Sequence, residues 1–144
     1  MLVHQILKSK ADDAVVTVKP GATIRDAAEI LANRKIGTVV ISADGETAQG
    51  ILSERDIVRQ LAQRGAGILT ETVDGYMTSK LVSCTRDASA DAVLATMTEK
   101  RFRHMPVIEE GKMVGLITLG DVVKARLSEL KMEKDALEGM IMGY

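Results

Sequence analysis

The chain has 144 residues, of which 46% are apolar and 2% aromatic, so aliphatic side chains and methionine must fill its interior. A chain of this length forms one compact domain or two very small domains that share a core. It carries 19 basic and 20 acidic residues, and this balance argues against a general nucleic-acid-binding protein, which needs a basic surface. No apolar run approaches the roughly 20 residues of a membrane span.

The first five residues and the single cysteine both indicate a cytoplasmic protein. Residues 1–5 do not have the layout of a signal peptide. Cys84 has no second cysteine to pair with, which is typical of a reducing compartment. We expect Cys84 in a buried strand as a packing residue, because no neighbouring His or Asp is placed to activate its thiol.

One supersecondary unit occurs twice in the sequence. Apolar strands are predicted at 15–18 and 81–84, and Thr17 and Ser83 are 66 positions apart (83 − 17). A turn follows each strand, then a Thr or Ser at an N-cap position, and then apolar residues at helical spacing. These patterns predict helices at 24–34 and 90–101.

The second half of the unit also repeats. Short buried strands are predicted at 38–41 and 105–108, with turns at 43–45 and 109–111. A further strand then runs directly into a helix, through 50–56 in the first copy and 115–121 in the second. The lead-in segments, 6–10 and 76–80, match as well, and residues 64–71 connect the copies.

These matches predict a first repeat at 1–65, a linker at 66–71, a second repeat at 72–126 and a C-terminal helical extension at 127–144. A β-α-β-β-α unit of this size exposes one sheet face and cannot bury a core alone. We therefore expect an α/β (α+β) fold whose two repeats pack sheet to sheet about a pseudo-twofold axis, with two equivalent clefts.

The strongest local signal is the glycine motif, Gly-h-h-[Ser/Thr]-x-x-Asp with h apolar, at Gly50–Asp56 and Gly115–Asp121. Its hydroxyl lies where a strand becomes a helix, and free N–H groups and the helix dipole favour a phosphate there. Its Asp lies one turn later and can accept hydrogen bonds from both hydroxyls of a ribose. The same spacing forms a capping box, and a duplicated fold duplicates its caps, so both interpretations stay open.

A basic turn precedes the second-copy strand, with Arg101, Arg103 and His104. These residues either form a solvated turn, which the residues alone favour, or face an anionic ligand. The first copy has Lys35-Ile36-Gly37 at this place, and Gly37 permits close backbone approach.

No arrangement of residues indicates an enzyme. The sequence has no phosphate-binding Walker loop, dinucleotide fingerprint or nucleophile elbow. Two histidines and one cysteine are too few for a convincing zinc site. We therefore assign no catalytic residue and no metal site.

The last helix is expected to run from Leu119 to about Met140. It carries a heptad stripe interrupted by one lysine, here called the C-terminal stripe: Val123, Leu127, Leu130, Lys134, Leu137 and Ile141. The stripe either packs on its own domain or forms a homodimer contact. The homodimer is favoured, because the helix extends beyond the repeat and an exposed apolar stripe is a liability in a monomer.

The two glycine motifs, the Arg103–Val107 strand and the duplicated topology together resemble the cystathionine-β-synthase (CBS) domain family, over roughly Val3 to Arg126. A tandem pair of such domains is a Bateman module, and this chain looks like the stand-alone bacterial members. The resemblance implies a regulatory module that acts on an unknown partner protein in trans. Its ligand is expected to be AMP first, with ADP, ATP, NAD(H) or S-adenosylmethionine as alternatives and no required metal.

The resemblance also implies which residues bind the ligand, with each cleft mixing both repeats. The first cleft is expected to use Ala22, Lys35, Ile36, Gly37, Thr118, Gly120 and Asp121. The second is expected to use Ala88, Phe102, Arg103, His104, Met105, Pro106, Ser53, Arg55 and Asp56. In each cleft the Asp holds the ribose, the hydroxyl lies near the α-phosphate, and backbone around Gly37 or His104 faces the base.

The two clefts are expected to differ in charge. The second has Arg55, Arg103 and His104 near the expected phosphate, whereas the first has Gly120 and Ile36 at the matching places, with only Lys35 close by. We therefore expect the second cleft to bind phosphates more tightly. The alternative function is a dimerising scaffold without ligand, which the presence of both carboxylates and both hydroxyls argues against.

Overall fold

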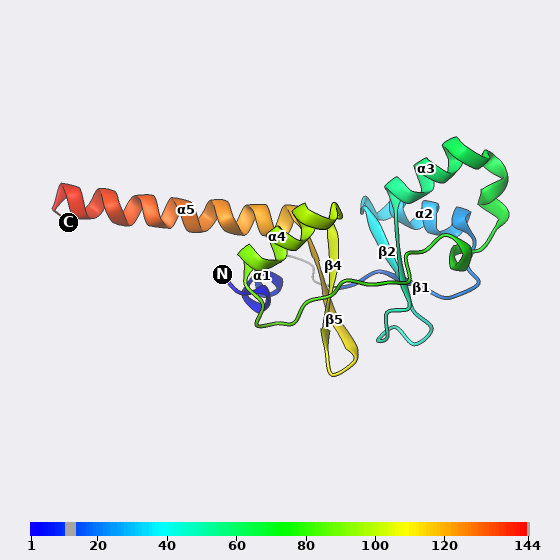
Figure 1. Ribbon diagram of the computed structural model, residues 1–144, viewed down its shortest axis with the longest axis horizontal. Coiled ribbons are helices and arrows are strands. Elements are labelled where there is room, and N and C mark those ends of the chain that lie inside the picture. The colour runs from blue at the N-terminus through cyan, green and yellow to red at the C-terminus, as the bar shows by residue number, and fades with distance from the viewer. Residues whose placement is uncertain (11–13, 144) are drawn as a thin grey trace. The chain divides into compact units, whose positions relative to one another are not determined.

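The computed structural model describes residues 1–10 and 14–143, and it confirms a mixed α+β fold (Figure 1). These residues form two compact units. Unit 2, residues 14–82 and 108–114, contains β1 (Thr17–Val18), α2 (Ile24–Arg34), β2 (Thr38–Ile41), β3 (Gly50–Ser53) and α3 (Glu54–Arg64). Unit 1 comprises the described residues of 1–13, 83–107 and 115–144, and it holds α1 (Val3–Ser9), α4 (Ala90–Lys100) and α5 (Leu119–Met142).

The sheet of unit 2 has the order β1-β2-β3. β1 pairs with β2 in parallel, with Val18 opposite Ile41, and β2 pairs with β3 antiparallel. All four residues of β2 are buried, as expected for a continuous apolar run in the middle strand. Aliphatic side chains of α2, α3 and the sheet fill the core of this unit.

The remaining strands form a hairpin, β4 (His104–Glu109) and β5 (Lys112–Thr118). Its turn uses two residues with positive φ, Glu110 at 51° and Gly111 at 78°. Two successive residues of this kind form the turn type that matches the twist of a hairpin. The turn predicted at 109–111 is therefore confirmed.

Capping residues set the limits of the two helices that the apolar spacing predicts. Thr23 caps α2 by accepting a hydrogen bond from the N–H of Asp26, and Ser89 caps α4 by accepting one from Ala92. Both helices end in a left-handed residue, Lys35 with φ 54° and Arg101 with φ 60°. Local signals thus suffice to place both helices.

The structure corrects the alignment of the two repeats at their central strands. Val18 lies opposite Ile41 in the first copy, and Cys84 lies opposite Val107 in the second, so both members are displaced by 66 positions (84 − 18 and 107 − 41). The sequence alignment of 38–41 with 105–108 was therefore wrong by one residue. The structural equivalent of Gly37 is Arg103, and that of Thr38 is His104.

The strand predicted at 81–84 is reduced to an isolated bridge at half-buried Cys84. In the first copy the N–H of Val40 donates to the carbonyl of Val16 at 3.1 Å. The equivalent of Val40 is Pro106, which has no N–H and therefore cannot make this bond. Proline thus weakens the strand pairing of the second copy.

The lead-in segments are exchanged between the repeats. Leu7, from the first lead-in, packs against Gly115 of the second repeat, where an added Cβ would lie 2.8 Å from its Cδ1 atom. Met77, from the second lead-in, packs in the same way against Gly50 of the first repeat. The glycine of each motif thus makes room for the lead-in of the other repeat.

Backbone hydrogen bonds just before the lead-ins follow the same exchange. The N–H of Val3 donates to the carbonyl of Ala88 at 2.8 Å, and that of Val73 donates to the carbonyl of Ala22 at 2.8 Å. The compact units therefore do not coincide with the repeats predicted at 1–65 and 72–126. The predicted limits of the two repeats and of the C-terminal extension at 127–144 stay predictions. The last residue of that extension, Tyr144, lies outside the described residues.

The segment predicted as a linker belongs to a core. Residues 66–70 form a short 3₁₀ helix whose Ile68 is 3% exposed and packs in the apolar cluster of unit 2. The two glycines of the connecting segment, Gly65 and Gly67, favoured a linker, whereas the large aliphatic side chain of Ile68, directly after them, fixes its position. Burial of that side chain outweighs the backbone freedom of glycine here.

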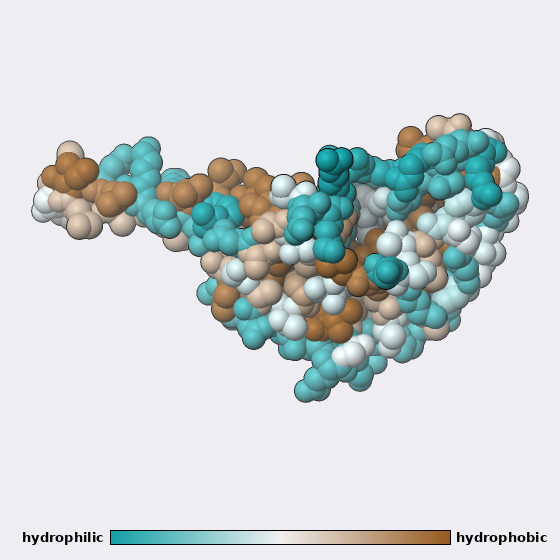
Figure 2. All heavy atoms as spheres, viewed as in Figure 1, coloured by the Kyte–Doolittle hydropathy of each residue, from teal (hydrophilic) through white to brown (hydrophobic). Residues whose placement is uncertain are grey.

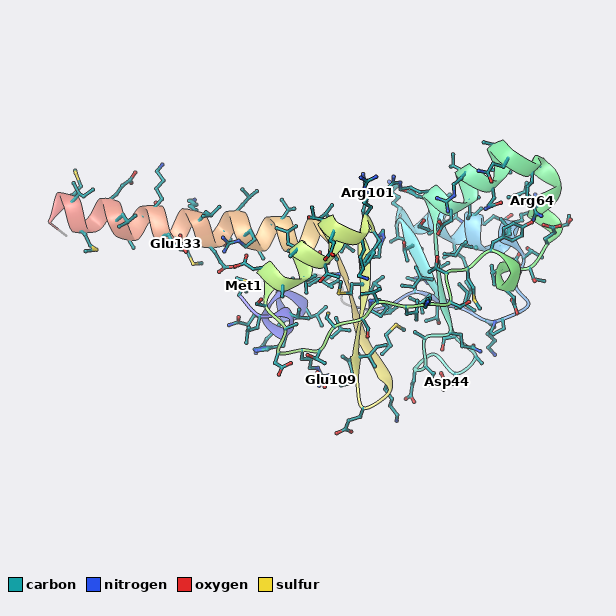
Figure 3. All side chains as sticks on the ribbon, viewed as in Figure 1. Met1, Asp44, Arg64, Arg101, Glu109 and Glu133 are labelled. Carbon is teal, nitrogen blue, oxygen red and sulfur yellow. The ribbon has the colours of Figure 1, made fainter. Side chains whose placement is uncertain are left out.

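The loop between β2 and β3 is organised by Asp44 (Figure 3). The N–H groups of Thr47 and Glu46 donate to its carboxylate at 2.7 and 2.8 Å, with the hydroxyls of Ser42 and Thr47 adding two further bonds. These donors, the N–H of Thr47 foremost, hold the pKa of Asp44 below its usual range, although desolvation acts in the opposite direction. The resulting stabilisation is present at neutral pH and is lost as the pH falls through that lowered pKa.

Candidate functional site

Both glycine motifs form strand-to-helix junctions closed by a capping box. In unit 2, Ser53 Oγ accepts from the N–H of Asp56 at 3.1 Å, and Asp56 accepts from the N–H of Ser53 at 3.0 Å. In unit 1, Thr118 and Asp121 make the same two bonds at 3.1 and 2.9 Å. The capping interpretation, which the sequence left open, is therefore confirmed.

A third capping box, at the start of α2, has the same geometry. Thr23 and Asp26 make the same reciprocal bonds at the start of α2, outside any glycine motif. What distinguishes the other two junctions is the strand that runs directly into the helix. In both junctions the positive end of the helix dipole therefore lies at the end of a strand, where it favours an anionic group.

The two motif carboxylates have different further partners. Asp56 accepts a hydrogen bond from Ser53 Oγ at 2.9 Å and one from Arg59 at 2.6 Å. The Arg59 side chain is 57% exposed, so this ion pair is largely solvated.

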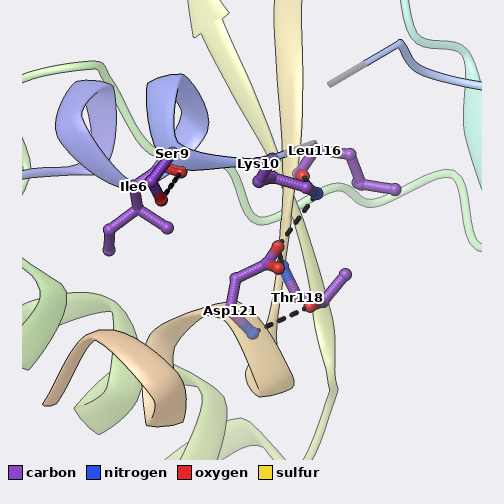
Figure 4. Close-up of polar contacts among 6 residues, drawn as sticks. All are labelled: Ile6, Ser9, Lys10, Leu116, Thr118 and Asp121. Carbon is purple, nitrogen blue, oxygen red and sulfur yellow. Dashed lines mark hydrogen bonds and ion pairs between the residues drawn. The ribbon is translucent and has the colours of Figure 1, made fainter. Parts of the chain in front are cut away.

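Asp121 is instead held by Lys10, from the exchanged first lead-in (Figure 4). Lys10 Nζ lies 2.9 Å from Asp121 Oδ2 and also donates to the carbonyl of Leu116 at 3.1 Å. The two side chains are only 22% and 21% exposed. Lys10 was not among the predicted site residues, because nothing in the sequence places residue 10 beside residue 121.

Replacing Lys10 by methionine is expected to destabilise the protein by about 1–2 kcal/mol, because a half-buried charged hydrogen bond is lost while the apolar stem is kept. Urea unfolding at neutral pH measures the change. Lys80→Met is the matched control, since Lys80 ends the second lead-in but is exposed. Equal losses from both variants would show that the Lys10–Asp121 pair contributes nothing specific.

Each junction lies beside the segment predicted to face the base. In unit 2 the N–H of Glu54 donates to the carbonyl of Gly37 at 2.9 Å. In unit 1 the N–H of Leu119 donates to the carbonyl of Arg103 at 2.8 Å. The structure thus brings Gly37 to the Ser53 junction and Arg103 to the Thr118 junction. The two cleft assignments combine residues of unit 1 with residues of unit 2, and those combinations stay predictions.

The charged residues of the prediction lie at the surface. Arg55 and Arg103 are exposed, and within the described part of the chain their guanidinium groups make no hydrogen bond or ion pair. Lys35 and Gly120 are exposed as well. In the corrected alignment, Arg103 of the second repeat is equivalent to Gly37 of the first. At the two junctions, Arg55 is equivalent to Gly120. The predicted excess of positive charge on the second-cleft residues therefore survives the correction.

Other predicted site residues take part in backbone hydrogen bonds or in packing. The carbonyls of Ala22 and Ala88 accept the lead-in N–H groups already described. Met105 and Pro106 are buried in β4, whereas Ile36, Phe102 and His104 are half-buried. Only the half-buried residues of this set offer side-chain surface to a ligand.

Thr38 is a candidate that the sequence analysis missed. It is 4% exposed, and its Oγ1 has no hydrogen-bond partner among the described residues. Because a buried hydroxyl without a partner costs free energy, such a group indicates a missing donor or acceptor. It was missed because the sequence alignment of this strand was wrong by one residue. In the structure Thr38 is the equivalent of His104, which was predicted as a site residue.

Neither metal binding nor membrane insertion is indicated by the described residues. No group of three or more His, Cys, Asp or Glu side chains in residues 1–10 and 14–143 is arranged to hold a metal ion. No helix within these ranges is both long and apolar enough to cross a bilayer.

Comparison with known families gives a match over most of the chain. The family model described as CBS domain matches residues 6–63 and 73–128. The mitochondrial CBS domain-containing protein CBSX3 of Arabidopsis thaliana is 30% identical over 148 residues, which cover 98% of this chain and 72% of that protein.

Solved structures with the same fold agree. The CBS-domain containing protein ATU1752 from Agrobacterium tumefaciens is 41% identical, with a TM-score of 0.83 over 88% of this chain and 99% of that one. The CBS domain pair of protein MJ0100, solved in complex with 5'-methylthioadenosine and S-adenosyl-L-methionine, is 26% identical, with a TM-score of 0.76. This match covers 90% of this chain and 98% of the MJ0100 chain.

Proposed function

Since the chain belongs to the CBS-domain family, we propose that it is a regulatory module that binds an adenosyl ligand, with AMP as the first expectation. The observation that carries this proposal is the pair of strand-to-helix junctions, each with a carboxylate one turn into the helix. The adenosyl ligands bound to the MJ0100 domain pair support it. In this proposal Asp56 and Asp121 hold ribose hydroxyls, and Arg55 and Arg103 attract the phosphate.

The second cleft is the stronger binder in this proposal. A ribose that approaches Asp56 competes with Arg59, whose exposed ion pair is weak. A ribose that approaches Asp121 competes with Lys10, which is half-buried and makes two hydrogen bonds. The exposed guanidinium groups of Arg55 and Arg103 add attraction for phosphate at the second cleft, where the first cleft offers only Lys35.

Thr38 offers a further polar contact to the ligand. Its buried Oγ1 has no hydrogen-bond partner among the residues that the structure describes, and Thr38 directly follows Gly37, the residue expected to face the base. A ring nitrogen or carbonyl of a base would satisfy it. This extends the predicted first cleft by one residue.

The module carries out no reaction of its own in this proposal. Ligand binding changes the relative populations of two conformations, and a partner protein reads the change. We propose that it acts in the reducing environment of the cytoplasm, in keeping with a chain that has a single cysteine and therefore no internal disulfide.

Thermal unfolding in the presence of AMP, ATP, NADH or S-adenosylmethionine tests the proposal. A ligand at 100 times its Kd is expected to stabilise the protein by about 2.7 kcal/mol. A shift with one adenosyl compound but not with guanosine monophosphate is the expected result. Absence of any shift at millimolar concentration would contradict the proposal.

A ligand-free scaffold is the second candidate. It is favoured by one observation: both motif hydroxyls serve as helix caps, and both motif carboxylates have basic partners within the chain. A scaffold would show no thermal shift with these compounds and would still form dimers.

A further inference from the structure

We propose that the C-terminal stripe of α5 binds the same stripe of a second copy of this chain, with the two helices antiparallel. Every member of the stripe is exposed, among them Leu127 at 63% and Leu137 at 59%. Figure 2 shows apolar side chains at the surface along α5. This proposal does not depend on the nucleotide.

α5 packs on its own unit through a different face. Val122 and Ala125 are buried, and Arg126 pairs with Asp91 of α4 at 2.9 Å. At about 100° per residue, Val122 and Ala125 lie roughly 130° around the helix from the stripe. The stripe therefore does not serve packing within the unit, and this decides between the two alternatives that the sequence left open.

The spacing of the stripe suits a two-stranded coiled coil. Its members alternate at intervals of four and three residues over most of the 24 residues of α5, so they occupy the two core positions of a heptad. A stripe of this kind is covered by a second helix with the same repeat. A second copy of α5 supplies that helix without any other partner.

A parallel pair of helices is disfavoured by charge. Each stripe residue would face its own copy, so two Lys134 side chains would meet in the apolar core. The flanking positions would set Arg126 against Lys131, and Glu133 against Glu138, each twice. Every flanking contact between two charged residues in a parallel dimer thus joins like charges. Glu133 lies on the exposed part of α5 (Figure 3).

An antiparallel pair removes most of this repulsion. Leu127 then faces Leu137, and Lys134 faces Leu130, whose surface its aliphatic stem covers while the ammonium group reaches water. Lys124 faces Glu138 at both ends of the contact, which gives two pairs of opposite charge. The remaining like-charge contacts, of Lys131 and of Glu133 with their own copies, lie near the twofold axis. Charge complementarity therefore selects the antiparallel arrangement.

Disulfide cross-linking tests the direction of the helices. Leu127→Cys and Leu137→Cys are each made in a Cys84→Ser chain and oxidised separately and as a mixture. The expected result is a covalent dimer in the mixture and none with either variant alone, because residue 127 faces residue 137 only in the antiparallel pair. Cross-linking of each variant with itself would show a parallel pair and overturn the proposal.

A matched pair of charge substitutions tests the surface itself in the full chain. Leu137→Glu is expected to raise the dimer Kd by about 100-fold, because it buries two uncompensated carboxylates. Met132→Glu is the control: Met132 is 63% exposed on the same helix but lies outside the stripe. Sedimentation over a dilution series measures both, and circular dichroism checks that each folds. An unchanged Kd for Leu137→Glu, or an equal rise for Met132→Glu, would overturn the proposal.

Discussion

Asp56→Ala is expected to weaken AMP binding by about 10- to 100-fold, because the charged hydrogen bonds from a ribose are worth about 1.5–3 kcal/mol. Isothermal titration measures the loss. Asp121→Ala is expected to cost less, since Lys10 already occupies that carboxylate. The difference in affinity between the two variants follows directly from the unequal partners of the two motif carboxylates.

The control for this experiment is Asp26→Ala. Asp26 closes the same kind of capping box at α2, so its loss removes a cap of equal type, and Asp26 is not a predicted residue of either cleft. Binding of AMP by Asp26→Ala is expected to equal that of the unaltered protein. A loss for Asp26→Ala as large as for Asp56→Ala, or a larger loss for Asp121→Ala, would contradict the assignment of the second cleft.

Ile68→Ala is expected to lower the free energy of unfolding by about 2–4 kcal/mol, because a large buried aliphatic side chain is replaced and a cavity remains. Ile68 is 3% exposed and packs with the core of unit 2. Equilibrium unfolding in urea gives the value. The result separates a core segment from a linker, which would tolerate the same substitution.

Val58→Ala serves as the comparison, since Val58 lies on α3 of the same unit and is 65% exposed. Its effect is expected to stay within about 0.5 kcal/mol. If both variants lowered the free energy of unfolding by the same small amount, residues 66–70 would behave as part of the linker that the sequence predicts. The packing of Ile68 would then not contribute to stability.

The duplication predicted the fold more reliably than the site. Thr23, Ser53 and Thr118 all cap helices with an Asp three residues later, yet only Ser53 and Thr118 belong to a glycine motif. A cap repeats whenever a fold repeats, whatever the protein binds. The differences between the copies, such as Arg103 against Gly37, are more informative about ligand affinity.

A single proline explains the least accurate part of the sequence prediction. The apolar run at 81–84 has the composition of a strand, but its neighbour Pro106 cannot donate the ladder bond that Val40 donates in the first copy. The sequence alignment of the same region was wrong by one residue. For this reason Thr38, the equivalent of the predicted site residue His104, was not predicted as a site residue. Composition predicts a tendency to form a strand, whereas pairing depends on the partner strand.

The sequence by itself determined the elements whose signals are local. The limits of α2 and β2 and the start of α3 follow from apolar spacing and N-cap residues, all within a few residues of one another. The doubled glycine motif and the family likewise required no coordinates. These features are local because hydrogen bonds within a turn or a helix connect near neighbours.

Only the tertiary structure decided the contacts between distant residues. It placed Leu7 on Gly115, Lys10 on Asp121 and Ile68 in a core, and it showed which face of α5 is left exposed. No periodicity encodes such contacts, because they depend on how whole elements pack after they form. The exchange of the lead-in segments brings a lysine of one repeat to the carboxylate of the other, and the two junctions differ for that reason.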